Sequence, residues 1–209
     1  MSLLPSRRAV TAGGLFLSFS AASGAFAQTT NADALSIGDP SAPVHLVEYA
    51  SMACPHCAHF HAENFPQLKA NYIDTGRVRL TMQEILTEPA VAAFGMFQLA
   101  RCGQVDGAEY FRRMGILFDR QHAILSSGTV GAFIESLVAI GGEWGLTREQ
   151  VTASLHDASG QQRISRSIEA ADAAGVSGTP TFFINGQRAA NDFVTPEGMV
   201  SGLDAALAR

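Results

Sequence analysis

Two cysteines separated by two residues are the part of this sequence best suited to covalent chemistry, in the order Cys54-Pro55-His56-Cys57. If the first cysteine begins a helix, the two sulfur atoms lie on adjacent turns, close enough to form a disulfide bond. The free N–H groups and the dipole at a helix N-terminus stabilise a thiolate and lower its pKa. We therefore predict that Cys54 is the attacking thiol in disulfide exchange and that Cys57 resolves the mixed disulfide.

The residues between the cysteines influence the direction of the reaction. His56 can donate a hydrogen bond beside the thiolate, and Pro55 is tolerated in the first turn of a helix. A fall in the Cys54 pKa from about 8.5 to about 4 favours the reduced pair by roughly 4 kcal/mol at pH 7. This corresponds to a shift of roughly 90 mV toward an oxidising couple. A pair tuned in this way donates its disulfide to other thiols.

Two other interpretations of the cysteine pair stay open. On a helix, Cys54, Cys57 and His61 share a face, with His59 nearby, so three zinc ligands could converge. A structural zinc ion needs a fourth ligand, and Cys102 alone is a poor source of one. A purely structural disulfide is the second alternative, although closing so short a loop constrains the unfolded chain little.

Local sequence patterns predict the elements that position the cysteines. Residues 44–49 are rich in strand-forming residues and predict a buried strand that leads to Cys54. A helix is expected from Cys54 to about Tyr72, kinked at Pro66. The alternation of polar and apolar side chains over residues 77–82 predicts a second strand.

The remainder of the chain divides into a helical middle and a mixed end. Helical patterns extend from Pro89 to about Ala174, and Thr147–Gln150 has the form of a capping box. A strand at Thr181–Ile184 is followed by Asn185-Gly186, which favours a tight hairpin turn. We expect Gln187–Ala190 to pair back and a last helix to begin with Thr195 as cap and Pro196 in its first turn.

The first 27 residues have the features of a signal peptide. Arg7 and Arg8 precede a short apolar segment, residues 9–22, and Ala25-Phe26-Ala27 offers small residues for cleavage. We expect cleavage after Ala27 and export of the chain, with the alternatives of a membrane anchor and a twin-arginine signal open.

Composition narrows the class of protein further. The 209 residues are 47% hydrophobic and 16% charged, as in a folded globular protein. Loss of Arg7 and Arg8 changes the formal charge from −5 to −7. The sequence contains no cluster of Lys or Arg, so nothing in it predicts nucleic-acid binding. One close cysteine pair in an exported chain of this size favours a redox function over a disulfide scaffold.

Together these features resemble a known family. The Cys-Pro-His-Cys sequence after a strand, with Gly178-Thr179-Pro180-Thr181 before a later strand, resembles the thioredoxin superfamily, and in particular the DsbA-type oxidases. The resemblance covers roughly residues 44–207. It implies an α/β protein with the thioredoxin fold and an inserted helical domain at about 87–174, following a signal peptide at 1–27 within a mature chain of 28–209.

The resemblance also implies roles for three further residues. Pro180 matches the family's cis-proline beside the cysteine pair, and Thr179 matches the residue whose backbone pairs with a substrate peptide. Glu48 matches a buried acid that assists proton transfer to the resolving thiol, although a solvent-facing position at a strand edge is the alternative. DsbA oxidases commonly carry valine where this chain has Thr179. Cys102 is expected to be a buried, inert thiol, with a redox-active cysteine as the alternative.

Three functional hypotheses follow. The first, which the resemblance implies, is a monomeric enzyme of the bacterial periplasm, with no cofactor or metal, that oxidises reduced or misfolded envelope proteins through a Cys54–Cys57 disulfide. The resemblance also implies that a DsbB-type membrane partner reoxidises it. The second is a disulfide reductase or isomerase on the same scaffold, served by an alternative reductant. The third is a metal-binding protein or chaperone.

Overall fold

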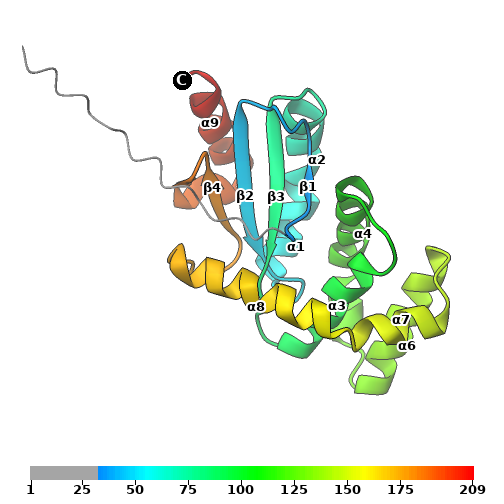
Figure 1. The fold of residues 1–209 in the computed structure, drawn as a ribbon. Coiled ribbons are helices and arrows are strands. Elements are labelled where there is room, and N and C mark those ends of the chain that lie inside the picture. Colours follow the sequence, from blue (N-terminus) through cyan, green and yellow to red (C-terminus); the bar gives the residue numbers. More distant parts are fainter. Residues whose placement is uncertain (1–32) are drawn as a thin grey trace, which may run out of the picture.

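The computed structural model describes residues 33–209 (Figure 1), so the predicted signal peptide lies outside the described residues. A five-stranded mixed sheet in the order β1-β3-β2-β4-β5 forms its centre. Strands β2 and β3 are parallel, and each of the other neighbouring pairs is antiparallel. The strands are β1 (Ser36–Ile37), β2 (Val44–Ala50), β3 (Val78–Glu84), β4 (Thr181–Ile184) and β5 (Gln187–Arg188).

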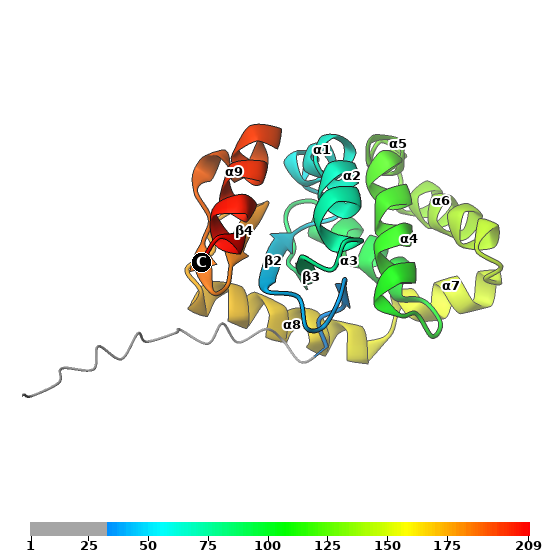
Figure 2. The same ribbon diagram turned by 90° about the horizontal axis from the view of Figure 1, so that it is seen from above.

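Helices cover both faces of the sheet. Helices α1 (Pro55–Glu63), α2 (Phe65–Leu68) and α9 (Pro196–Leu207) lie on one face, and α8 (Ala158–Ala173) crosses the other (Figure 2). A π-helical turn, Lys69–Ile73, continues α2, and a 3-10 turn, Asn191–Val194, precedes α9. None of the helices in residues 33–209 is long and apolar enough to cross a membrane.

The helices between β3 and β4 form the insertion. Helices α4 to α7 gather beside the β1 edge of the sheet, and α8 returns the chain to β4 (Figures 1 and 2). The members that precede α8 are α3 (Ala90–Arg101), α4 (Gly107–Asp119), α5 (Gln121–Leu125), α6 (Val130–Glu143) and α7 (Arg148–Leu155). This arrangement confirms the expected fold, a thioredoxin fold with inserted helices.

The alternation of side chains along β2 decides which residues reach the cysteines. Val47 and Tyr49 face α8 and pack with Ala171 in a small apolar cluster. Leu46 belongs to the main core on the face that α1 covers, and Glu48 points to the same side. A strand buried on both faces therefore delivers one carboxylate toward the active-site helix.

Most local expectations agree with the structure. The Asn185-Gly186 turn, the Thr147 capping box and the Thr195 cap are all present. The predicted single helix from Cys54 to Tyr72 is instead interrupted at Asn64. Pro66 cannot donate a helical N–H, so it lies in the first turn of a new short helix that begins at Phe65. The sequence does not predict β1, since a strand of two residues is too short to show alternation.

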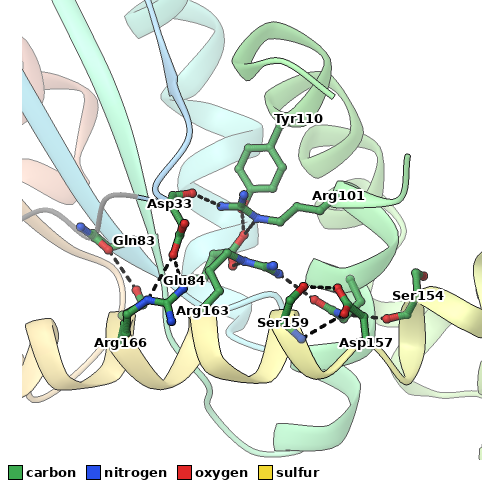
Figure 3. Close-up of polar contacts among 12 residues, drawn as sticks. Asp33, Gln83, Glu84, Arg101, Tyr110, Ser154, Asp157, Ser159, Arg163 and Arg166 are labelled. Atoms are coloured by element: carbon green, nitrogen blue, oxygen red, sulfur yellow. Dashed lines mark hydrogen bonds and ion pairs between the residues drawn. The ribbon is translucent and has the colours of Figure 1, made fainter. Parts of the chain in front are cut away.

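A buried carboxylate ties the insertion to the sheet (Figure 3). Glu84, the last residue of β3, is 2% exposed and accepts hydrogen bonds from three helices. The donors are Arg101 Nε of α3 (2.5 Å), Tyr110 Oη of α4 (2.6 Å) and Arg163 Nε of α8 (3.1 Å). Arg101 and Arg166 also bind Asp33, which anchors the leading segment to the same helices.

Removal of the charge at Glu84 tests this connection. Glu84→Gln leaves the guanidinium groups of Arg101 and Arg163 largely buried without their counter-charge, so unfolding in urea should be easier by about 3–5 kcal/mol. Glu135→Gln, which breaks an exposed pair with Arg148, is the matched control and should leave the midpoint near that of wild type. Equal midpoints for the two variants would contradict a structural role for the buried cluster.

Candidate active site

Cys54 lies where α1 begins. It is the N-cap residue with an extended backbone, and its Sγ accepts a hydrogen bond from the Cys57 N–H at 3.4 Å. Pro55 occupies the first turn, where the missing N–H has no helical partner to lose. The Cys54 N–H donates to the Ser51 carbonyl at 3.1 Å, which closes the turn after β2. Strand, turn and helix thus hold the sulfur at the free N–H groups of the helix.

Hydrogen bonds stabilise the thiolate of Cys54. They lower its pKa from 9.0 to about 5, the largest contribution coming from the Cys57 thiol. The Thr179 side chain and the backbone N–H groups of Cys57 and His56 contribute less, and partial burial opposes them. His56 thus acts here through its backbone N–H, while its side chain and that of Pro55 are exposed.

Cys57 has the opposite electrostatic environment. Burial is the main cause that raises its pKa far above the ordinary value, and its hydrogen bond to Cys54 adds to the effect. The negative charges of Cys54 and Glu48 raise the Cys57 pKa further. Both cysteines are free thiols in this structure. The pair therefore consists of one sulfur that ionises readily and one that retains its proton.

The loop before β4 reaches the same sulfur from the other end of the chain. The Thr179–Pro180 peptide bond is cis, and the Thr179 carbonyl oxygen lies 3.3 Å from Sγ of Cys54, where it accepts a hydrogen bond when Cys54 is protonated. Both residues are partly exposed, unlike the buried Cys57. A partly open backbone segment beside a reactive sulfur can pair with an extended peptide.

Glu48 is completely buried, which overturns the alternative that it faces water at a strand edge. Strand β2 is internal to the sheet, and no part of the Glu48 side chain reaches solvent. The two carboxylate oxygens lie 3.0 and 3.1 Å from Nε2 of His61, on α1. The His61 ring is stacked between Phe65 and Phe118, with centroids 4.9 and 4.5 Å away.

This pairing bears on the zinc alternative, because His61 is one of the ligands it requires. Nε2 of His61 is hydrogen-bonded to Glu48 and is therefore not free to bind a metal ion. His59 is exposed on the same helix. Within residues 33–209, no group of three or more His, Cys, Asp or Glu side chains is arranged to hold a metal ion. Cys102 is buried at the end of α3, its Sγ 3.5 Å from the Gln150 carbonyl.

Three polar side chains that support the site, those of Ser51, His61 and Gln121, are not predicted to do so by the sequence. Ser51 Oγ accepts hydrogen bonds from the N–H and the hydroxyl of Thr87, at 3.1 and 2.9 Å. His61 was considered only as a zinc ligand, and Gln121 was not singled out. The helical spacing of His61 from Cys57 could have placed it facing β2, but no sequence signal links Gln121 to a loop 67 residues earlier.

The fold and the cysteine site together define a protein of the thioredoxin family. A family model described as Thioredoxin matches residues 30–205, and the chain belongs to this family. The match includes every residue assigned above to the candidate active site.

Individual relatives narrow the comparison. The chain is 31% identical over 157 residues to a Rickettsia felis protein provisionally named a protein-disulfide oxidoreductase. The alignment covers 74% of this chain and 54% of that protein, so the chain spans about half the length of such curated relatives.

Two solved structures share the fold. BdbD from Bacillus subtilis superposes with a TM-score of 0.73 at 16% identity, covering 84% of this chain and 94% of BdbD. The α-DsbA1 protein of Wolbachia pipientis gives a TM-score of 0.72 at 22% identity, with coverage of 85% and 92%. The inserted helices are therefore part of the shared architecture.

The ionised sulfur should make the stability of the reduced protein depend on pH. The folded state keeps Cys54 deprotonated down to about pH 5, whereas the unfolded chain binds that proton below about pH 9. The stabilisation is therefore complete above pH 9, decreases below it, and is lost below about pH 5. We expect about 2 kcal/mol at pH 7, allowing for screening by solvent.

Urea unfolding of reduced wild type and Cys54→Ser between pH 4 and pH 9 measures this contribution. The difference between the two proteins should increase with pH across this range, since serine does not ionise. Parallel stability curves would show that the sulfur is not held as an anion.

Proposed function

We propose that this protein is a thiol–disulfide oxidoreductase of the DsbA type that oxidises protein thiols in the bacterial periplasm. The observation that supports it most directly is the asymmetry between the two cysteines, with the pKa of Cys54 lowered to about 5 and that of Cys57 raised. The match to proteins named for disulfide oxidoreduction supports the same reaction class. The predicted signal peptide at 1–27 supports the location.

The proposed reaction begins with the oxidised enzyme. A substrate thiolate attacks Sγ of Cys54, the Cys54–Cys57 bond breaks, and Cys57 leaves and takes up a proton. A second substrate thiolate then attacks the substrate sulfur of the mixed disulfide, and Cys54 leaves as a thiolate. The substrate gains one disulfide, and the enzyme keeps both electrons as one thiolate and one thiol. A sulfur with a low pKa is a good leaving group in the last step.

The direction of exchange follows from the energy of the reduced state. About 2 kcal/mol of thiolate stabilisation at pH 7 shifts the couple by roughly 40 mV toward oxidising. This is smaller than the roughly 90 mV anticipated from the sequence, because the Cys54 pKa is about 5 rather than about 4 and solvent screens the charge. The sign still favours donation of a disulfide.

We propose that Glu48, with His61 as its hydrogen-bond partner, transfers a proton to and from the Cys57 thiol. Glu48 is near enough that its charge contributes to the raised Cys57 pKa, and its carboxylate is hydrogen-bonded to His61 away from water. Buried beside a thiol that must gain and lose a proton, such a carboxyl group can act as general acid and base.

The proposed substrates and redox partner are those that the resemblance to DsbA-type oxidases implies. Thr179 and Pro180 would bind the backbone of a reduced or misfolded envelope protein, and a DsbB-type membrane protein would reoxidise the cysteine pair. A reductase or isomerase, served by a membrane reductant, is the second candidate, favoured by the threonine rather than valine at position 179.

Equilibration with glutathione buffers at pH 7 distinguishes the two directions. We expect a reduction potential roughly 40 mV above the about −270 mV of thioredoxin, with the fraction of reduced protein followed by thiol trapping and mass spectrometry. Cys57→Ser, which can form no internal disulfide, is the control for trapping. A potential at or below that of thioredoxin would indicate a reductase.

Substitution of the buried acid tests its proposed role. Glu48→Gln keeps the shape of the side chain but cannot exchange a proton with Cys57, so reduction of the enzyme by a small thiol should slow at least about tenfold. Acid-quenched thiol trapping gives the rate. Glu63→Gln, at the exposed end of α1, is the matched control. Wild-type rates in Glu48→Gln would remove Glu48 from the mechanism.

A further inference from the structure

A glutamine from the insertion contacts the loop that presents the reactive sulfur. Gln121 is the first residue of α5, and its side chain is buried, with 5% of its surface exposed. Its Nε2 atom donates to the carbonyl oxygens of Met52 at 2.8 Å and of Cys54 at 3.0 Å. We call residues 51–54, which connect β2 to α1, the redox loop.

The two hydrogen bonds account for both hydrogens of the amide. A primary amide has two N–H donors, and here each reaches a different carbonyl of the same short loop. Met52 is fully buried and Cys54 nearly so, so water cannot readily replace the donor. The Cys54 carbonyl also accepts from the Ala58 N–H at 3.2 Å, in the first turn of α1. Gln121 therefore binds the backbone of the loop at the point where the helix starts.

The position of the redox-loop backbone determines which groups surround the Cys54 sulfur. Sγ of Cys54 accepts a hydrogen bond from the Cys57 N–H at 3.4 Å, and the backbone N–H groups of Cys57 and His56 lower the Cys54 pKa. These contacts depend on the position of the Cys54 backbone, from which α1 begins. Ser51 and Thr87 fix the start of the redox loop, whereas Gln121 fixes its end. Of these contacts, only those of Gln121 come from a helix of the insertion.

We propose that Gln121 is a positioning residue, which holds the redox loop so that the Cys54 sulfur stays within reach of its hydrogen-bond partners. This inference rests on the proposed function. It gives the insertion a part in setting the redox couple, through one amide and two carbonyl groups. Without the amide, the carbonyl oxygens of Met52 and Cys54 lose the hydrogen bonds that connect the redox loop to α5.

Gln121→Met is the variant of choice, because methionine has a similar length and volume but donates no hydrogen bond. The Cys54 thiolate should become less stable, so its pKa should rise and the glutathione equilibrium should shift three- to tenfold toward the disulfide. A tenfold shift corresponds to about 30 mV. The thiolate is titrated by its ultraviolet absorbance and by the pH dependence of its alkylation rate.

Gln98→Met is the matched control. Gln98 is also a buried glutamine of the insertion whose Nε2 donates to a carbonyl, that of Ser154 at 2.7 Å. Its loss should lower stability but leave the Cys54 pKa and the glutathione equilibrium at wild-type values. Equal redox shifts in the two variants would overturn the proposal, because they would reflect a general loosening of the helices.

Wild-type values of both the Cys54 pKa and the glutathione equilibrium in folded Gln121→Met would also overturn the proposal. If that variant does not fold, Gln121→Asn is used instead, because its amide is one methylene too short to reach both carbonyls. We then expect the Cys54 pKa and the glutathione equilibrium to shift in the same direction by a smaller amount. A wild-type protein that exchanges no disulfide would refute the proposed function, while the Cys54 titration would still decide the role of Gln121.

Discussion

The other features of this site depend on the attraction between the Cys54 sulfur and the hydrogen-bond donors around it. Burial of Cys54 by itself would favour the neutral thiol. The Cys57 thiol, the Thr179 side chain and two backbone N–H groups outweigh that effect. Because each acts only at short range, the chain must bring a turn, a helix and a distant loop to one atom with little tolerance.

The sheet supplies this precision. Central strand β2 pairs with β3 on one side and with β4 on the other, so the ends of β2 and the start of β4 are fixed relative to each other. The redox loop follows β2 directly, and Thr179 and Pro180 directly precede β4. The same strand places Glu48 beneath Cys57, so that one element positions both the reactive loop and the buried acid.

The sequence predicted the parts of the site that depend on local chemistry. The spacing of Cys54 and Cys57, the proline in the first turn and the hairpin at Asn185 each have a signature within a few residues. The resemblance to a known family added Thr179, Pro180 and Glu48. Gln121 and the pairing of Glu48 with His61 could not be predicted, because they depend on how the insertion and α1 pack against the sheet, which no short pattern records.

The pairing of β4 with β2 has a consequence for how the chain acquires its structure. His45 at the start of β2 donates a backbone hydrogen bond to Asn185, 140 positions later, and the whole insertion is synthesised between them. Contacts so distant in sequence slow folding, since a long loop must close before they form. Until β4 pairs with β2, one edge of β2 is unpaired. Cys54 then also lacks the Thr179–Pro180 segment that is proposed to bind its substrates. In a nascent chain, Cys54 and Cys57 are therefore present well before Thr179 and Pro180 are synthesised and can lie beside them.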